Sequence, residues 1–504
     1  MNRQPHRFVV LGGGTAGWMA ASLIAHRLKQ RASVTLVESP EIGIIGVGEG
    51  STPQLKAFFD ELGITEREWM PRCNATYKNG ISFHGWSKLQ GYESYFHPFQ
   101  SELDRHTAPA FFFHTRARRT GRDVWAHPNR FFLSAQLAEA GLGPIPAENF
   151  PFEIGYGYHF DSALVGDFLR DHATSKLGVA HLQTRVEAVR QHDNGDIAAL
   201  MAQGGEEVAG DFFVDASGFR GALVQEALGE PFESFSNNLF NDAAVAMPSA
   251  RDDGATACET RSTALSNGWA WRIPLTNRTG NGYVYSSTYL DANAAETELR
   301  QHLGLLDSDV TARHLKMKVG QVRRSWVRNC LAVGLSQGFI EPLEATALHI
   351  VHSTISGFID AYAADNFGPG HADNFNAAIH RRYEGIRDYI VCHYRMNRRG
   401  EGEYWRANAE NPNLSDELKA VMTCWFRGGD LEEEVHRLEI ERYYAPLSWH
   451  CLLAGYGQFP DAAKMSPPEA DLPITDMTKI DRFIAGCSRN FSSHDELLAR
   501  LESA

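Results

Sequence analysis

Apolar residues near the N-terminus form two strand-length runs separated by one of helical length. Arg7–Leu11 is a short buried-strand pattern, and Trp18–Leu28 is apolar and alanine-rich like a helix packed on a sheet. Ser33–Val37 is a second strand pattern and ends in Glu38. Because parallel strands need a crossover connection, usually a helix, this order predicts a Rossmann-type βαβ unit.

The turn between the first strand and the helix is Gly12-Gly13-Gly14-Thr15-Ala16-Gly17. Gly12 permits a tight turn, Gly14 lets a pyrophosphate approach the backbone, and Gly17 permits close packing of helix on strand. Free N–H groups at the helix start face the phosphate charge, and Glu38 would accept hydrogen bonds from ribose hydroxyls. We predict dinucleotide binding here, with Thr15 and Ala16 among the contacts.

After Glu38 the chain does not continue with regular βα units, as a dehydrogenase normally would. A glycine-dense loop that includes Gly46-Val47-Gly48-Glu49 suits close approach to a second, larger part of a cofactor. Two strand patterns return far downstream, Phe212–Gly218 and Cys330–Val333, the second leading to Gly338. This organisation is typical of flavoprotein monooxygenase-like domains with an inserted substrate region. We predict an α/β fold that binds FAD, with Gly48, Glu49 and Gly338 also near the cofactor.

The last third of the chain has helical spacing. Ala345–Ala364, Asp416–Glu441 and Ser493–Leu501 each predict a helix. We expect an FAD-binding domain over residues 1–395, carrying an inserted substrate-facing sheet, and a mostly helical substrate-binding part over residues 396–504. No pattern predicts an oligomeric state.

Charge and composition narrow the function classes. The chain has 504 residues, with 48 Lys and Arg against 62 Asp and Glu, a net charge of −14. It therefore lacks the basic surface expected for nucleic acid or anionic membranes. Its seven cysteines contain no Cys-x-x-Cys pair, which favours a reducing compartment and argues against a zinc or disulfide framework. Met1–His6 is polar rather than signal-like, and no apolar run approaches ~20 residues. We expect a cytoplasmic protein with no membrane segment and no metal.

Gly268–Pro274 reads Gly-Trp-Ala-Trp-Arg-Ile-Pro, in which Trp269 and Trp271 stand two residues apart on a β-prone segment. Side chains at that spacing project from the same face of a strand. Such a pair is often ordinary core. Beside a redox cofactor, however, a double-indole wall would exclude water and shape the path of a reactive oxygen species.

Several separated motifs together resemble the flavin-dependent tryptophan halogenase family, in the same order from about residue 7 to 460. They are the glycine turn, the loop at Gly46–Glu49, Gly268–Pro274, Gly338–Thr346, and His393-Tyr394 with the Arg-rich loop that leads to Tyr404-Trp405. The resemblance implies that reduced flavin (FADH2), oxygen and chloride or bromide are used to halogenate an electron-rich arene such as an indole. Nothing in the chain provides a nicotinamide site, so FADH2 would come from a separate NAD(P)H:flavin reductase.

The resemblance also assigns residue roles. Lys78 matches the lysine that meets hypohalous acid and presents the halogen to the ring, and its apolar flank would favour a neutral amine. Glu344 matches the carboxylate that stabilises the cationic ring and removes its proton. Read without the resemblance, Lys78 would be a solvated surface lysine and Glu344 a helix-start acid.

The remaining substrate and halide candidates also depend on the resemblance. His97 and Phe99 match a pair that clamps the arene, and Trp269 and Trp271 would fill the space between flavin and substrate. The backbone N–H groups of the candidates at the start of the predicted helix, Thr346 and Ala347, would offer a halide site.

The chain departs from the family pattern at two places. Relatives that act on tryptophan usually carry Ser and Gly where this chain has Ala345 and Ala347. They also have a Tyr-Tyr pair before a Cys that grips the amino-acid carboxylate, and the matching place here is Trp449-His450-Cys451, with Tyr443-Tyr444 slightly earlier. We therefore predict that Trp449 and His450 face a smaller or differently decorated indole, or another arene.

Two other functions share part of this evidence. An FAD-dependent aromatic hydroxylase would use the same cofactor turn and inserted region, but it gives no role to Lys78 and Glu344. A non-catalytic flavin-binding protein would give no product under any condition.

Overall fold

A computed structural model describes residues 4–41, 48–251, 253–460 and 476–502. The chain forms two compact units, each built from three separate segments. The first contains residues 1–75, 160–236 and 317–383, and the second contains residues 76–159, 237–316 and 384–504. The two functional domains expected at 1–395 and 396–504 stay a prediction, since these units describe packing alone.

The first unit is built around a six-stranded sheet in the order β21-β22-β13-β1-β2-β9. Its neighbouring pairs are parallel except β21–β22 at one edge. The strands are β1 (His6–Leu11), β2 (Ala32–Glu38), β9 (Ala180–Gln183), β13 (Phe212–Asp215), β21 (Trp326–Val327) and β22 (Cys330–Ala332). The strand patterns at Arg7, Ser33, Phe212 and Cys330 are confirmed, and all four lie in one sheet. This is the predicted Rossmann-type α/β fold.

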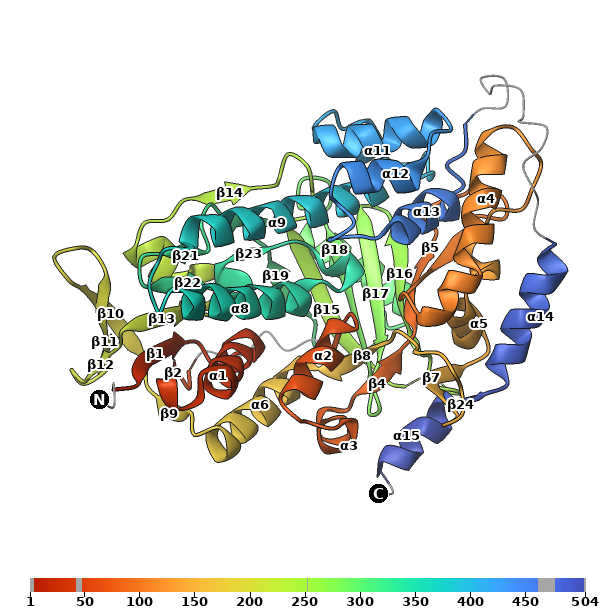
Figure 1. Cartoon of the computed structure of the whole chain (residues 1–504). Helices are drawn as coiled ribbons and strands as arrows, with labels where there is room; N and C mark the ends of the chain where they lie inside the picture. The colour runs from red at the N-terminus through yellow and green to blue at the C-terminus, as the bar shows by residue number, and fades with distance from the viewer. Residues whose placement is uncertain (1–3, 42–47, 252, 461–475, 503–504) are drawn as a thin grey trace. The chain divides into compact units, whose positions relative to one another are not determined.

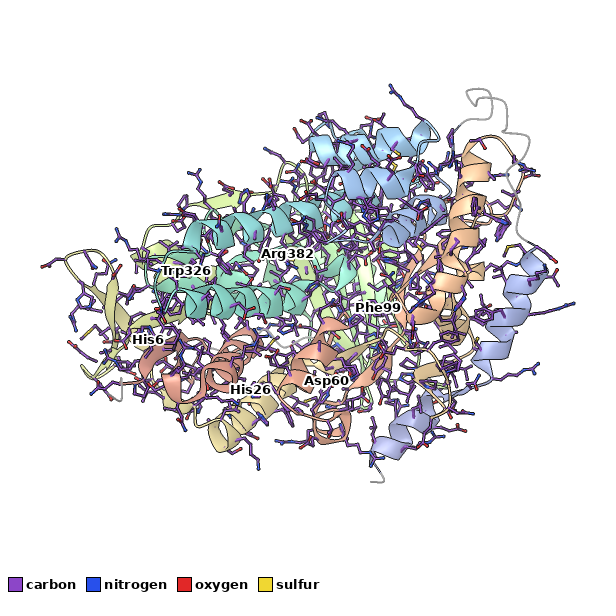
Figure 2. All side chains as sticks on the ribbon, in the orientation of Figure 1. His6, His26, Asp60, Phe99, Trp326 and Arg382 are labelled. Carbon is purple, nitrogen blue, oxygen red and sulfur yellow. The ribbon has the colours of Figure 1, made fainter. Side chains whose placement is uncertain are left out.

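Helices cover this sheet. α1 (Thr15–Leu28) contacts both α6 (Ser162–Lys176) and α8 (Ala347–Ala364), as Figure 1 shows beside β1 and β2. The buried side of the sheet is aromatic: Trp326, labelled in Figure 2, lies edge-on to Phe358, with ring centres 5.0 Å apart. The unit also contains α2 (Gln54–Glu61), α3 (Glu66–Trp69), β3 (Gly48–Gly50) and two small sheets, β10-β11-β12 (Val186–Gln191, Ile197–Ala202, Glu207–Ala209) and β14-β20-β23 (Phe232–Ser234, Gly320–Val322, Gly338–Phe339).

The helix expected from Ala345 starts two residues later than the pattern predicts. Pro342–Glu344 forms a separate 3₁₀ turn, Ala345 has a left-handed backbone (φ 57°), and α8 begins at Ala347. A left-handed residue cannot continue a right-handed helix, so the break falls at Ala345. Glu344 therefore lies before the helix rather than in its first turn.

The second unit contains a seven-stranded sheet in the order β19-β15-β18-β17-β16-β5-β6. Figure 1 shows β15 to β18 as long strands. In this sheet the β5–β16 pair is parallel, and the other neighbouring pairs are antiparallel. The strands are β5 (Gly80–His84), β6 (Ser94–Pro98), β15 (Ala243–Ser249), β16 (Glu259–Leu265), β17 (Gly268–Pro274), β18 (Thr279–Tyr285) and β19 (Arg313–Lys316). β4 (Thr76–Lys78) pairs with β8 (Gly157–Asp161), and β7 (Leu142–Pro146) pairs with β24 (Phe491–Ser493).

The C-terminal part is mostly helical, as predicted. The single run expected from Asp416 to Glu441 is two helices, because Gly428 has a left-handed backbone (φ 73°) and ends the first. Residues 461–475, a stretch rich in Pro and Asp, lie outside the described residues. The remaining helices are α4 (Ala108–Arg119), α5 (Leu133–Glu139), α7 (Ala292–Leu303), α9 (Ala372–Arg395), α10 (Glu403–Glu410), α11 (Asp416–Phe426), α12 (Leu431–Arg437), α13 (Pro446–Gly455), α14 (Met477–Ser488) and α15 (His494–Glu502). None of the described helices is long and apolar enough to cross a bilayer.

Candidate functional site

The glycine turn after β1 is shaped by close contacts that only glycine permits. Gly12 has a φ of 116°, and a Cβ there would lie 2.2 Å from the backbone oxygen of Ala216, at the end of β13. A Cβ on Gly17 would lie 1.9 Å from the oxygen of Gly12. The first turn of α1 therefore sits directly on the strand end, as the dinucleotide-binding pattern requires.

Gly14 is different, because nothing in its own surroundings demands glycine. Its backbone is extended (φ −73°, ψ 175°), and a Cβ there would meet no atom of the described residues within 4 Å. The space beside Gly14 lies at the N-terminus of α1, where the first backbone N–H groups lack helical partners. A phosphate group fits this position because it would accept those N–H bonds and experience the positive end of the helix dipole.

The neighbouring candidates surround this turn. Glu38 lies over it: a Cβ on Gly13 would be 1.6 Å from Glu38 Oε2, while Glu38 Oε1 lies 2.6 Å from His181 Nε2. Thr15 Oγ1 donates to the backbone oxygen of Ser162 at 3.1 Å. The Ala16 methyl packs closely under Gly334. These residues form a turn with an accessible carboxylate at the end of β2, which fits the adenosine end of FAD.

Two further cofactor candidates lie elsewhere in the first unit. Glu49, on β3, is partly buried, and desolvation raises the pKa of its carboxyl to about 7, against a hydrogen bond with Ser162 that lowers it and with Asp161 adding to the rise. Gly338, on β23, lies close to Gly320 and Tyr383, so a Cβ there would be 2.6 Å from the Gly320 oxygen. Gly48 begins β3, whereas Gly46 and Val47 lie outside the described residues.

Glu344 is buried in the 3₁₀ turn that precedes α8, with 4% of its surface exposed. Thr346 is the N-cap of α8 and Ala347 is its first residue. The N–H groups of the first helical turn lack intrahelical acceptors, so this helix end can bind an anion. Thr346 and Ala347 thus lie at a helix N-terminus, as the halide prediction requires, although the helix starts later than expected. Halide binding there stays a prediction.

Lys78 is fully buried at the end of β4. Its side-chain nitrogen lies 5.3 Å from the centre of the Phe99 ring, a cation–π distance. Figure 2 labels Phe99. A solvated surface lysine, the alternative interpretation of the sequence, is wrong.

Strand register explains why Lys78 and Phe99 meet. β5 and β6 pair antiparallel with Gly80 opposite Pro98 and Ile81 opposite His97. The residues just before β5 therefore lie beside the residues just after β6. The Phe99 N–H lies 3.5 Å from the Asn79 oxygen, which continues the ladder by one step.

His97 belongs to a cluster that the sequence did not predict. His97 Nε2 lies 3.0 Å from Ser448 Oγ, and the Tyr389 hydroxyl donates to the Ser448 backbone oxygen at 3.0 Å. Tyr389 stacks on Tyr444 with ring centres 3.6 Å apart, and Trp449 lies edge-on to Tyr389 at 4.9 Å. Tyr389 and Ser448 carry no sequence signal, because α9 and α13 bring them to His97 from distant parts of the chain.

His450 does not join this cluster in the contacts of the described residues. Its ring lies 4.4 Å from that of Phe112, and its Nδ1 lies 2.9 Å from Thr115 Oγ1, both on α4. Consecutive helical residues differ by about 100° in direction, so Trp449 and His450 face different neighbours. Burial lowers the pKa of His450 well below its ordinary value. These contacts support a packing role for His450, and its contact with the substrate stays a prediction.

The predicted indole pair on β17 shares one face. The ring centres of Trp269 and Trp271 are 6.3 Å apart, and both rings are buried. Trp271 lies across Gly282 of β18, where a Cβ would be 2.1 Å from its ring. Within the described part of the chain the buried Trp271 Nε1 has no hydrogen-bond partner. The shared face is thus confirmed, and its position between flavin and substrate remains a prediction.

Comparisons with known proteins agree with this fold and cofactor turn. The family model for tryptophan halogenase matches residues 7–469. The chain belongs to the tryptophan halogenase family. It is 35% identical to the 7-chloro-L-tryptophan 6-halogenase KtzR of Kutzneria sp. (strain 744), with 98% of this chain and 99% of that protein covered.

Solved structures give the same result. The crystal structure of the tryptophan 6-halogenase SttH from Streptomyces toxytricini matches at a TM-score of 0.86 with 32% identity, covering 99% of this chain and 100% of SttH. BrvH, a flavin-dependent halogenase from Brevundimonas sp. BAL3, matches at a TM-score of 0.84 with 32% identity, covering 99% and 100%. This family member is an FADH2-dependent halogenase that uses a halide ion, and the hydroxylase alternative is not favoured.

Proposed function

We propose that this enzyme halogenates an indole or a related arene that lacks the amino-acid group, through Lys78 and Glu344. The observation that carries the proposal is the environment of Lys78: a fully buried side chain whose nitrogen faces the Phe99 ring at 5.3 Å. Lysine is almost never fully buried unless it is paired or functional. An amine in this setting is suited to receive a halogen away from water.

The relay balances in atoms and electrons. Bound FADH2 would supply two electrons and two protons, so that O2, a halide ion and one further proton give hypohalous acid and water. The Lys78 amine then forms an N–halogen bond, and its hydrogen leaves with the hydroxide of hypohalous acid as water. The arene carbon forms the new carbon–halogen bond as the N–halogen bond breaks. The ring proton passes to Glu344, and the lysine nitrogen takes up one proton to return to its amine.

Glu344 is proposed to act on the arene. A carboxylate that is largely buried interacts more strongly with developing positive charge than one in water. Its 4% exposure supports such a role, which is to stabilise the cationic ring and to accept the proton that leaves it.

The substrate preference follows from the cluster around His97. Three of its polar residues are engaged with one another, since Ser448 bonds both His97 and Tyr389. The other members, Tyr444 and Trp449, offer ring surface. None of these five side chains carries a fixed charge, whereas a free amino acid presents both a carboxylate and an ammonium group that are costly to bury unpaired. A neutral, flat arene suits this cluster better.

The experiment compares indole and tryptophan under identical conditions with FAD, NADH, a separate NAD(P)H:flavin reductase and either bromide or chloride. Mass spectrometry of the products detects the halogen by its isotope doublet. We expect faster halogenation of indole, and faster halogenation of tryptophan would contradict the substrate proposal.

A Lys78→Ala variant tests the relay in the same assay. Halogenation should vanish while flavin binding and oxygen consumption continue. Lys88→Ala is the matched control, because Lys88 is 46% exposed and pairs with Glu401. Retained halogenation in Lys78→Ala would contradict the role of the lysine.

A further inference from the structure

The two residues that flank Lys78 are held by groups from distant parts of the second unit. The backbone N–H of Tyr77 donates to Nε2 of His494 at 3.0 Å, across 417 positions of the chain. The backbone N–H of Asn79 donates to the Cys258 oxygen at 2.6 Å. Lys78 is thus the middle residue of a segment fixed on both sides.

The tautomer of His494 follows from its two partners. A backbone N–H can only donate and a backbone oxygen can only accept, so Nε2 carries the lone pair toward Tyr77. Nδ1 carries the hydrogen and donates to the Thr256 oxygen at 2.9 Å. Both bonds are satisfied only by the neutral ring, because an imidazolium would place an N–H against the N–H of Tyr77.

The start of α15 also contacts residues 256–258, the segment whose Cys258 oxygen accepts the Asn79 N–H. The Asp495 carboxylate accepts the Thr256 N–H, with both oxygens at 3.3 Å. Thr256 lies two residues before Cys258, whose oxygen accepts the Asn79 N–H. The first turn of the C-terminal helix therefore contacts Tyr77 directly and supports Asn79 through residues 256–258.

A second histidine, His159 on β8, bonds to Thr76 on β4. Thr76 Oγ1 donates its single hydrogen to the Pro274 oxygen at 2.7 Å. The same Oγ1 lies 3.1 Å from His159 Nδ1 and has no second hydrogen to donate, so His159 Nδ1 carries a hydrogen and donates it to Thr76. In the neutral ring, His159 Nε2 then accepts from Thr260 Oγ1 at 3.0 Å. This chain of bonds joins β4 to the end of β17, the strand that carries Trp269 and Trp271.

We propose that His494 and His159 are positioning residues for Lys78: as neutral rings of defined tautomer they fix β4 so that its amine receives and delivers the halogen. The inference rests on the proposed lysine relay. Neither histidine touches the reacting atoms in this proposal. A small displacement of a reacting group is known to cost large factors in rate, which is how such residues act.

The charges that face these rings support neutral forms. Burial, then Lys78 on β4 and His494 on α15, lower the pKa of His159 well below its ordinary value. Burial lowers the pKa of His494, against the opposing effects of the Thr256 carbonyl and Asp495. The neutral forms should therefore persist at neutral pH and be lost only in acid.

The test uses the full-length enzyme with FAD, a flavin reductase, bromide and indole. Three readouts are taken together: halogenated product per O2 consumed, hypohalite captured by an added β-diketone, and thermal stability. His494→Leu removes both bonds of the ring. His494→Gln can place a side-chain oxygen near the Nε2 position, where it accepts from the Tyr77 N–H. His494→Asn can keep only the donor to the Thr256 oxygen.

We expect His494→Leu to reduce product per O2 at least tenfold and to raise captured hypohalite, with His494→Gln retaining several-fold more product than His494→Asn. His436→Leu, at a 62% exposed histidine on α12, is the matched control. An unchanged product ratio in His494→Leu overturns the inference. The inference is also overturned if product per O2 falls in proportion to thermal stability in all three His494 variants, because a merely structural role predicts that result.

Two further measurements test the inference even if the His494 variants fold poorly. Thr260→Val, which removes the donor to His159, should lower product per O2 several-fold, whereas Thr260→Ser should not. In the unmodified enzyme the same ratio should stay constant through the ordinary histidine range, about pH 6.5, and fall only at more acidic pH, because the pKa values of both rings are lowered, while FAD stays bound. A flat acid profile, or Thr260→Val equal to Thr260→Ser, overturns the inference. If the unmodified enzyme halogenates no arene, the proposed function itself fails.

Discussion

The side-chain nitrogen of Lys78 lies 5.3 Å from the centre of the Phe99 ring, and both residues are placed by the first rung of the β5–β6 ladder. A cation over an aromatic face gains about 0.5–2 kcal/mol, depending on how far it is desolvated. Lys78 is fully buried, so the upper part of that range applies. The ring therefore holds the side-chain nitrogen in place.

Phe99→Leu should keep the apolar volume and remove the aromatic face. The loss of about 0.5–2 kcal/mol corresponds to roughly a 2- to 30-fold decrease in halogenation rate. Steady-state kinetics with indole and bromide measure it. Phe113→Leu, at a 42% exposed ring on α4, is the control and should leave the rate unchanged. A Phe99→Leu enzyme as fast as the control would show that the ring contributes nothing to the lysine.

Glu344→Gln should remove the acceptor for the ring proton and leave a side chain of the same shape. General-base contributions are typically 10²- to 10⁴-fold, so we expect kcat to fall by about that factor with KM for the arene little changed. Asp360→Asn provides the control, since this carboxylate near the end of α8 is 76% exposed. If Glu344→Gln stays within threefold of the unmodified enzyme, the carboxylate has no catalytic role.

Gly14→Ala separates cofactor binding from folding. A Cβ at Gly14 meets no protein atom within 4 Å and the backbone angles suit alanine, so the thermal stability of the flavin-free protein should not change. The methyl would occupy the space that we assign to the pyrophosphate, so the Kd for FAD should rise at least tenfold. Gly486→Ala on α14, which also meets nothing, should change neither quantity. Unchanged FAD affinity in Gly14→Ala would place the phosphates elsewhere.

Glu49→Gln should change stability in a pH-dependent way. The carboxyl has a pKa of about 7 when folded against an ordinary value of 4.5. Between these values the folded chain keeps a proton that the unfolded chain releases, so stability falls as pH rises and stays lower above pH 7. The cost is roughly 3 kcal/mol, which the amide does not incur. Flavin-free Glu49→Gln should therefore gain more in Tm at pH 8 than at pH 5, and an equal change at both pH values would contradict this account.

Local sequence was sufficient for the parts of the molecule that depend on neighbouring residues. The strand–turn–helix–strand unit from Arg7 to Glu38 follows from apolar periodicity and from glycines whose missing Cβ atoms make room for adjacent backbone. The common face of Trp269 and Trp271 follows from the two-residue repeat of a strand. Each of these features is set by interactions within a short stretch of chain.

Other features depend on contacts between segments that no local pattern links. The burial of Lys78 requires β6 to bring Phe99 beside it and α15 to bring His494 to Tyr77. The left-handed break at Ala345 is likewise a consequence of packing, because alanine favours helix and gives no sign of ending one. Sequence therefore determined the cofactor fold and, through the family resemblance, singled out Lys78. Tertiary structure decided what surrounds that lysine, since burial and hydrogen-bond partners exist only once distant strands and helices have come together.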